Sequence, residues 1–269
     1  MLYDCFTFFN ELELLEIRLN ELDDIVDKFV LVEATRTHTN KIKPLYFKEN
    51  KEKFSKFTDK IIHIVVDDMP ESNDAWVLEN YQRNSIVRGL KDCNSHDVIM
   101  ISDVDEIPRS EVVLKVKYSF GIKTLEQNFY YYYLNVLNNE IWRRGTKILF
   151  YKYLTTPQEI RMMEAGPLIK NGGWHFSYLG GTKQIKSKIQ SFAHQEFNSP
   201  KYTDIKKIEQ RVKKNKDPFL RKGYKNKVVE IDKTYPKYIL NNLDKFKHLI
   251  KSPKCCLLKR FFKKNKCIK

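Results

Sequence analysis

The chain has 269 residues, with 49 lysines and arginines against 34 aspartates and glutamates and a formal net charge of +15. Its 42% hydrophobic and 13% aromatic residues exclude a disordered, collagen-like or repeat protein and suit a chain that buries a core of its own. Ten of the positive charges, and no acid, fall between Lys245 and Lys269, so the first 244 residues carry only +5. The basic character therefore belongs mainly to the C-terminal end.

The five cysteines include no CxxC pair and no zinc-finger spacing, which argues against a disulfide framework and a structural zinc. The first 20 residues carry early acids and lack both a basic segment and a continuous apolar core, so we expect no signal peptide or anchor there. No stretch approaches the roughly 20 apolar residues that cross a bilayer. These features favour a cytoplasmic protein whose basic end is its only contact with the inner face of a membrane.

Apolar runs and helical spacings alternate along the first half of the chain. Leucines at three- and four-residue steps predict a helix over residues 12–22, and a second helix is expected over 76–90. Strands are predicted at 1–10, 28–34, 60–66 and 97–102. Continuous apolar strands separated by helices indicate an α/β fold with a mixed, mostly parallel sheet flanked by helices.

The second half alternates less regularly. It contains an aromatic run at 129–133, a predicted strand at 147–153 and a glycine-rich segment at 171–181. We interpret these as mixed strands and loops that complete a single domain over residues 1–250. Residues 251–269 form a separate basic amphipathic tail.

The sharpest local feature is the segment Ser-Asp-Val-Asp-Glu-Ile-Pro at 102–108, where an apolar strand ends in three acids. Ligands of open α/β sheets bind at the carboxyl ends of strands, and Asp103 and Asp105 can present oxygens to one Mg²⁺ or Mn²⁺ ion. Such an ion would bridge to a diphosphate. The plainer interpretation is an acidic turn in which Glu106 lies at the start of a helix near Pro108.

The sequence resembles glycosyltransferase family 17 over nearly its whole length. The resemblance lies in Tyr-Asp-Cys-Phe at 3–6 with Asn10 and Glu11, Phe-Val-Leu-Val-Glu at 29–33 followed by Pro44 and Leu45, Tyr-Gln-Arg-Asn at 81–84, Asp-Val-Asp-Glu-Ile-Pro at 103–108, Gly-Trp-His-Phe-Ser at 173–177 and Pro-Lys-Tyr-Ile-Leu at 236–240. The resemblance implies a GT-A-type fold, a divalent metal, inversion at the anomeric carbon and a nucleotide-sugar donor, with UDP-N-acetylglucosamine expected. The basic tail is not part of it, and the acceptor is not carried over.

Transfer with inversion needs a metal-neutralised diphosphate and a base that takes the proton of the acceptor hydroxyl. Asp103, Asp105 and His175 are the predicted metal ligands, and His194 is the alternative imidazole. Trp174 offers a flat apolar face to a donor sugar. Glu196 is the candidate base and Glu164 its rival; either can equally be a solvated surface acid.

Polar residues at other strand ends are expected to face the same crevice. Asn10, Glu11 and Glu33 are predicted to hold the base or ribose of the nucleotide, although a strand-end carboxylate is often only a cap. Arg83 can reach a phosphate or the uracil, or it can be an ordinary surface arginine.

The tail from Lys251 alternates apolar and cationic pairs near the helical repeat, a pattern typical of a helix on anionic lipid; a solvated charged end is the alternative. It suits a lipid-linked saccharide acceptor as well as a free glycan. Two other function classes compete with the transferase: a non-catalytic carbohydrate- or polyanion-binding protein on the same fold, and a metal-dependent nucleic-acid enzyme. No nucleic-acid partner is expected, because the charge lies in the tail and no binding motif accompanies it.

Overall fold

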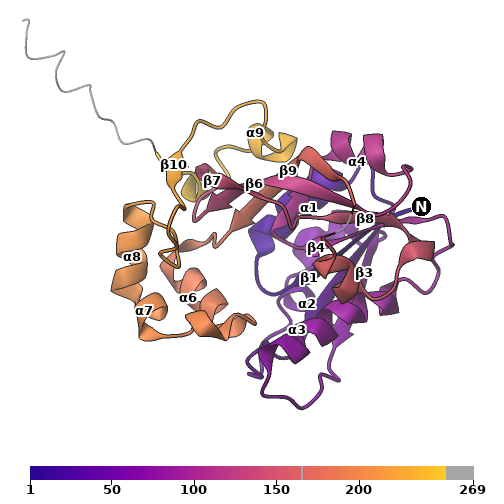
Figure 1. Cartoon of the computed structure of the whole chain (residues 1–269), viewed down its shortest axis with the longest axis horizontal. Helices are drawn as coiled ribbons and strands as arrows, with labels where there is room; N and C mark the ends of the chain where they lie inside the picture. The colour runs from indigo at the N-terminus through magenta and orange to yellow at the C-terminus, as the bar shows by residue number, and fades with distance from the viewer. Residues whose placement is uncertain (165, 253–269) are drawn as a thin grey trace, which may run out of the picture.

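A computed structural model describes residues 1–164 and 166–252 of the chain. Within these ranges, ten strands join in one mixed sheet with helices on both faces, as Figure 1 shows. Most of the predicted amphipathic tail, from residue 253 onward, lies outside the described residues. Within them, no helix has the length and apolar character needed to cross a membrane.

The first half of the sheet is parallel. Strands β1 (Leu2–Phe8), β2 (Lys28–Ala34), β3 (Ile61–Val66) and β4 (Val98–Asp103) lie in the order β3-β2-β1-β4. Helix α1 (Leu12–Leu22) follows β1, and α3 (Ala75–Asn84) precedes β4. After β3 the chain returns past β2 and β1, so the strand order reverses between β1 and β4. Ligands of open α/β sheets bind at such a reversal.

Beyond β4 the sheet is largely antiparallel, so the expectation of a mostly parallel sheet was wrong for this half. Strands β8 (Lys147–Phe150), β6 (Lys123–Tyr131), β7 (Val136–Trp142) and β10 (Asn226–Val228) extend the sheet beyond β4 in antiparallel pairs. Only the short connection 132–135 joins β6 to β7, and a parallel neighbour would need a much longer crossover. The predicted strand at 147–153 ends at Phe150, and Tyr151–Tyr153 form a 3₁₀ turn.

The glycine-rich segment is a strand rather than a loop. Strand β9 (Leu168–Ser177) pairs with β6 in parallel and with β5 (Glu106–Pro108) in antiparallel. A Cβ on Gly172 would lie 2.5 Å from the Cβ of Leu125, and one on Gly173 would lie 2.1 Å from the carbonyl oxygen of Ile107. Glycine therefore allows β9 to pack closely against both neighbours.

The other helices complete the two faces and one side of the molecule. They are α2 (Tyr46–Glu49), α4 (Ser110–Val116), α5 (Pro157–Met162), α6 (Gly181–Ser191), α7 (Pro200–Thr203), α8 (Ile205–Lys213) and α9 (Lys237–Asn241). The predicted helix over 76–90 divides into α3 and a 3₁₀ helix, Ser85–Gly89. Helices α6, α7 and α8 pack together and appear in orange at the side of Figure 1.

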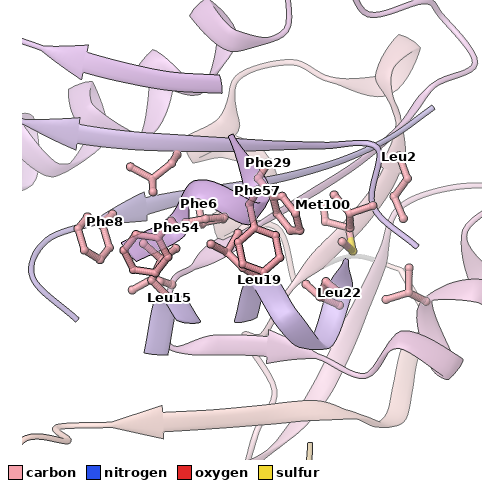
Figure 2. Packing of buried hydrophobic residues seen from close by; sticks show 14 of the residues in the cluster. Leu2, Phe6, Phe8, Leu15, Leu19, Leu22, Phe29, Phe54, Phe57 and Met100 are labelled. Atoms are coloured by element: carbon pink, nitrogen blue, oxygen red, sulfur yellow. The ribbon is translucent and has the colours of Figure 1, made fainter. Parts of the chain in front are cut away.

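The parallel strands bury apolar side chains on both faces. On one face, the leucines of α1 pack against alternate residues of β1, together with phenylalanines from β2 and from the 3₁₀ helix Lys51–Phe57 (Figure 2). On the other face, Cys5, Val30 and Ile99 pack against Ile86 and Leu90 beyond α3. Burial on both faces explains why these strands read as continuous apolar runs.

Candidate functional site

A cleft of about 390 Å³ opens at the carboxyl ends of β1 and β4, where the strand order reverses. Its volume is in the range of cavities that bind small molecules. Thr7 and Phe8 reach it from β1, and Asp103 and Asp105 from the turn after β4. Further walls come from helices α3, α5 and α6, from strands β6, β7 and β9, and from the segments 36–43 and 192–221. The strand topology therefore brings the predicted acidic pair into this cleft.

The buried residue Arg18 of α1 holds the turn that carries these acids. Its guanidinium forms a bidentate pair with Asp4 of β1, at 2.7 and 2.6 Å, and both side chains are fully buried. It also donates to the main-chain carbonyls of Asp103 at 3.0 Å and Glu106 at 2.8 Å. One cation thus links the helix, the first strand and the acidic turn, and fixes the direction in which the acids point.

Two arginines neutralise Asp103. Its carboxylate accepts from Arg83 Nη2 at 3.0 Å and from Arg161 Nη2 at 3.3 Å. Burial alone would raise the pKa of Asp103, but the two guanidinium groups outweigh burial and hold the pKa well below its usual range. Asp103 is therefore ionised at neutral pH. Arg83 lines the cleft and is buried, so it is not an ordinary surface arginine.

Asp105 has a different set of cationic neighbours. Its Oδ2 accepts from Lys188 Nζ at 2.8 Å, and its Oδ1 lies 3.5 Å from Nε2 of His175. Burial opposes ionisation, but Lys188 and His175 together hold the pKa of Asp105 well below its ordinary value. Lys188 also contacts Glu11 at 3.0 Å. Asp105, His175 and Glu11 thus all line the cleft as predicted.

Glu106 does not cap the helix that follows it. Its carboxylate accepts from Arg161 at 2.5 Å and from the indole of Trp142 at 2.6 Å, in a fully buried position beneath the cleft. Helix α4 begins after Arg109 without a side-chain cap. Burial raises the pKa of Glu106 although Arg161 opposes the rise. This third acid supports the site from below rather than lining it.

The donor set at Asp105 suits a divalent cation. No group of three or more His, Cys, Asp and Glu side chains is placed to hold a metal within residues 1–164 and 166–252. Asp105 and His175 nevertheless face each other, and Mg²⁺ in phosphate-binding sites often has only one or two protein ligands and takes the rest from phosphate and water. Nδ1 of His175 is buried without a hydrogen-bond partner. The residues fit a metal held jointly with a diphosphate.

Three predicted nucleotide contacts do not line the cleft. Glu33 is fully buried and accepts from the main-chain N–H of Phe47 at 3.0 Å and from His63 at 3.1 Å, because its side chain points toward α2. Trp174 is buried in a separate core cluster, where its indole donates to the carbonyl of Thr234 at 3.1 Å. Asn10 accepts a hydrogen bond from the side chain of Gln184.

The two predicted bases lie at the surface. Glu196 belongs to the 3₁₀ turn Gln195–Phe197; its side chain is 56% exposed and bonds to His194 Nδ1 at 2.7 Å. His194 lines the cleft, so Glu196 lies at its rim. Glu164 is 82% exposed and contacts Arg144 at 3.3 Å.

Sequence reasoning missed an acid inside the cleft. Glu79 of α3 contacts Arg83 Nη2 at 2.9 Å and lies 3.7 Å from Nδ1 of His38. It also missed Lys188, Arg161 and Arg18. The signal for two of these was an inward position on a helix: Arg18 follows the buried Leu15 by three residues, and Lys188 follows the buried Ile185 by three. A charge in an apolar stripe indicates a buried partner.

Aromatic side chains form the outer wall of the cleft. Trp76 at the start of α3 is 39% exposed, and its ring meets His194 edge to face at 4.6 Å. Phe219 stacks on Phe197 with ring centroids 3.9 Å apart and on Phe192 at 6.4 Å. The cleft therefore combines a charged floor at the strand ends with an aromatic rim, an arrangement suited to a sugar that carries phosphate groups.

Comparisons with known proteins match these features to one family. The sequence model described as glycosyltransferase family 17 matches residues 1–258. The rat and mouse proteins named beta-1,4-mannosyl-glycoprotein 4-beta-N-acetylglucosaminyltransferase are each 24% identical over alignments of 291 residues, which cover 91% of this chain and 53% of theirs. The human protein of that name is 33% identical over 116 residues, 40% of this chain and 22% of its own. The chain thus spans about half the length of the rat and mouse relatives.

Proposed function

The chain belongs to glycosyltransferase family 17, and on that premise we propose that it transfers N-acetylglucosamine from UDP-N-acetylglucosamine to a hydroxyl of a glycan acceptor. The proposed reaction depends on a divalent metal and inverts the anomeric carbon. The observation that carries the proposal is the acidic pair Asp103 and Asp105, which lies in the cleft at the reversal of the strand order among buried cations. The donor sugar is taken from the printed names of the relatives.

The charged floor supports binding of the donor. The strands lie in the order β3-β2-β1-β4, and the cleft opens between β1 and β4, an arrangement suited to a nucleotide. We therefore propose that the fold is of the GT-A type. Asp105 and His175 would hold the metal, which would supply positive charge to the leaving diphosphate. Arg83 and Arg161 fix Asp103 and add positive charge beside the same position. Together these cations would stabilise the departing UDP.

The aromatic rim supports binding of the acceptor. Trp76 presents an exposed indole at the mouth of the cleft, and a pyranose ring stacks readily on such a surface. Glu79 and Arg83 follow Trp76 on the same helix at steps of three and seven residues, so all three side chains line the cleft. Trp76 would hold the acceptor ring while polar groups deeper in the cleft direct its hydroxyls.

The base must lie on the acceptor side. Glu196 remains our proposed base, because it lies at the aromatic rim and bonds to His194, which lines the cleft. Glu79 is the competing candidate inside the cleft, although its carboxylate is already paired with Arg83. Glu164 lies farther out and pairs with Arg144.

Calorimetry of UDP binding with and without Mn²⁺ tests the donor site. We expect Asp105→Ala to abolish the Mn²⁺-dependent part of UDP binding while the circular dichroism of the protein stays unchanged. Glu164→Gln is the matched control, because it removes a surface carboxylate and should bind UDP like the original protein. Metal-dependent hydrolysis of a panel of UDP- and GDP-sugars then identifies the donor. Unchanged Mn²⁺-dependent affinity in Asp105→Ala would show that the metal is bound elsewhere.

A further inference from the structure

We propose that the Lys188 ammonium is a tethered cation that occupies the position between Glu11 and Asp105 and competes there with the divalent metal. The inference rests on the metal-dependent function proposed above and adds a residue that controls the metal affinity. It also adds Glu11 to the carboxylates that surround the metal position.

The geometry of Lys188 is that of a bound cation. Its Nζ lies 2.8 Å from Asp105 Oδ2 and 3.0 Å from Glu11 Oε1, so one charge joins two carboxylates from different elements. The side chain is 21% exposed and lies over the ring of Tyr178 at 5.6 Å. Helix α6 directs it inward, because the neighbouring Ile185 and Ile189 are buried in the core.

The ammonium and a metal ion would compete for one carboxylate, because Lys188 contacts Oδ2 of Asp105 and His175 faces its Oδ1. A bound Mg²⁺ approaches carboxylate oxygens to about 2.0–2.1 Å and brings a double charge, which repels an ammonium in contact with the same atoms. Asp105 is also the carboxylate that faces His175, the one imidazole near enough to serve as a further ligand among the described residues. A metal held by His175 and Oδ1 of Asp105 would therefore repel the ammonium on Oδ2 of the same carboxylate, so metal binding favours departure of Lys188.

Lys188 is better suited to leave than the arginines beside it. Asp103 is held by two guanidinium groups, and Arg161 also contacts Glu106. Arginine keeps its charge and its fixed fork of donors, whereas lysine is a point charge on a flexible stem. The exchangeable cation of the site is thus the one at Asp105. In the metal-free protein it pairs the buried carboxylate of Asp105 with a positive charge and also contacts the partly buried carboxylate of Glu11.

Manganese affinity measured without nucleotide tests the competition. Electron paramagnetic resonance of free Mn²⁺ gives the dissociation constant of the full-length protein, of Lys188→Met and of Lys188→Arg. We expect Lys188→Met to bind Mn²⁺ at least about tenfold more tightly, because a competing positive charge is removed. Lys188→Arg keeps the charge on a less exchangeable group, so it should bind Mn²⁺ no more tightly than the original protein. Lys183→Met, on the exposed face of the same helix, should stay near the original value. Equal or weaker binding by Lys188→Met would overturn the proposal.

A measurement on the unmodified protein covers the case in which Lys188→Met fails to fold. Reductive methylation with formaldehyde, mapped by mass spectrometry, reports how readily each lysine amine is reached. We expect Mg²⁺ to accelerate methylation of Lys188 and to leave Lys183 unchanged. An unchanged or slower rate at Lys188 would refute displacement. Neither assay contains a sugar nucleotide, so failure of the proposed transfer reaction would appear separately, in the hydrolysis of UDP-sugars.

Discussion

Replacing Arg18 by methionine should both destabilise the protein and disorganise its acidic turn. Arg18 is fully buried, forms a bidentate pair with Asp4 and donates to the main-chain carbonyls of Asp103 and Glu106. Methionine fills a similar volume without charge or donors. The substitution therefore leaves one buried carboxylate and two buried carbonyls without this partner.

The expected loss is large compared with the total stability of a domain. Breaking a buried ion pair from one side typically costs about 3–5 kcal/mol, and a buried carbonyl left without a partner costs about 1–3 kcal/mol. The Glu106 carbonyl still accepts from Thr146 at 3.3 Å, so most of the loss comes from the ion pair. We expect the free energy of unfolding to fall by at least about 4 kcal/mol, when a typical total is about 5–15 kcal/mol. The matched control is Arg88→Met, which removes a partly exposed pair with Asp68 and should cost at most about 1 kcal/mol.

Urea unfolding followed by circular dichroism measures these differences, and a second substitution isolates their cause. The double variant Asp4→Leu with Arg18→Met removes the unpaired charge, so it should be more stable than Arg18→Met alone. Where Arg18→Met folds, it should bind UDP with Mn²⁺ more weakly, because the turn that carries Asp103 has lost its anchor. A loss below about 1 kcal/mol, or a double variant no more stable than the single one, would refute this account.

Three further predictions concern the base, the pH dependence and the tail. Glu196→Gln should lower turnover about 10²–10⁴-fold and leave UDP binding unchanged. Normal turnover in Glu196→Gln, together with a loss of that size in Glu79→Gln or Glu164→Gln, would identify Glu79 or Glu164 as the base. Burial raises the pKa of Glu21 to about 7, so its contribution to stability is present at low pH and is lost as pH rises from about 4.5 to about 7. Glu21→Gln should therefore flatten the unfolding free energy across that interval, and an unchanged slope in pH-dependent urea unfolding would contradict the assignment. Removal of residues 253–269 should reduce co-sedimentation with anionic vesicles at low salt and leave UDP-sugar hydrolysis intact; equal pelleting of both forms would show that the tail is only a solvated end.

Local sequence patterns were sufficient for the parallel half of the sheet and for its acidic turn. Strand β2 begins and ends where its apolar run does; β3 begins one residue later than predicted, and β4 begins and ends one residue later. These strands are buried on both faces, so each forms an uninterrupted apolar run that needs no distant partner to be recognised. The placement of Asp103 and Asp105 at a strand end followed from the same pattern.

The sequence was less informative about which of two neighbouring strand residues faces the cleft. Trp174 and His175 are adjacent and were both expected in the site, yet only His175 lines the cleft, while Trp174 is buried in the core. Successive side chains of a strand point to opposite faces, so the two could not both serve one pocket once the segment formed β9. The sequence left open whether this segment was a strand or a loop, and in a loop this constraint would not apply.

The sequence by itself indicated candidate residues for binding a cation or a sugar. Only the tertiary structure shows which of these side chains lie in contact. Arg161 is 58 positions from Asp103 and Lys188 is 83 from Asp105, so no local pattern links these charges. Their contacts depend on the crossover after β3, which places β4 beside β1, and on the positions of α5 and α6 at the strand ends. Apolar periodicity predicts which face of a helix is buried. It does not predict which charged side chain of another element lies against that face.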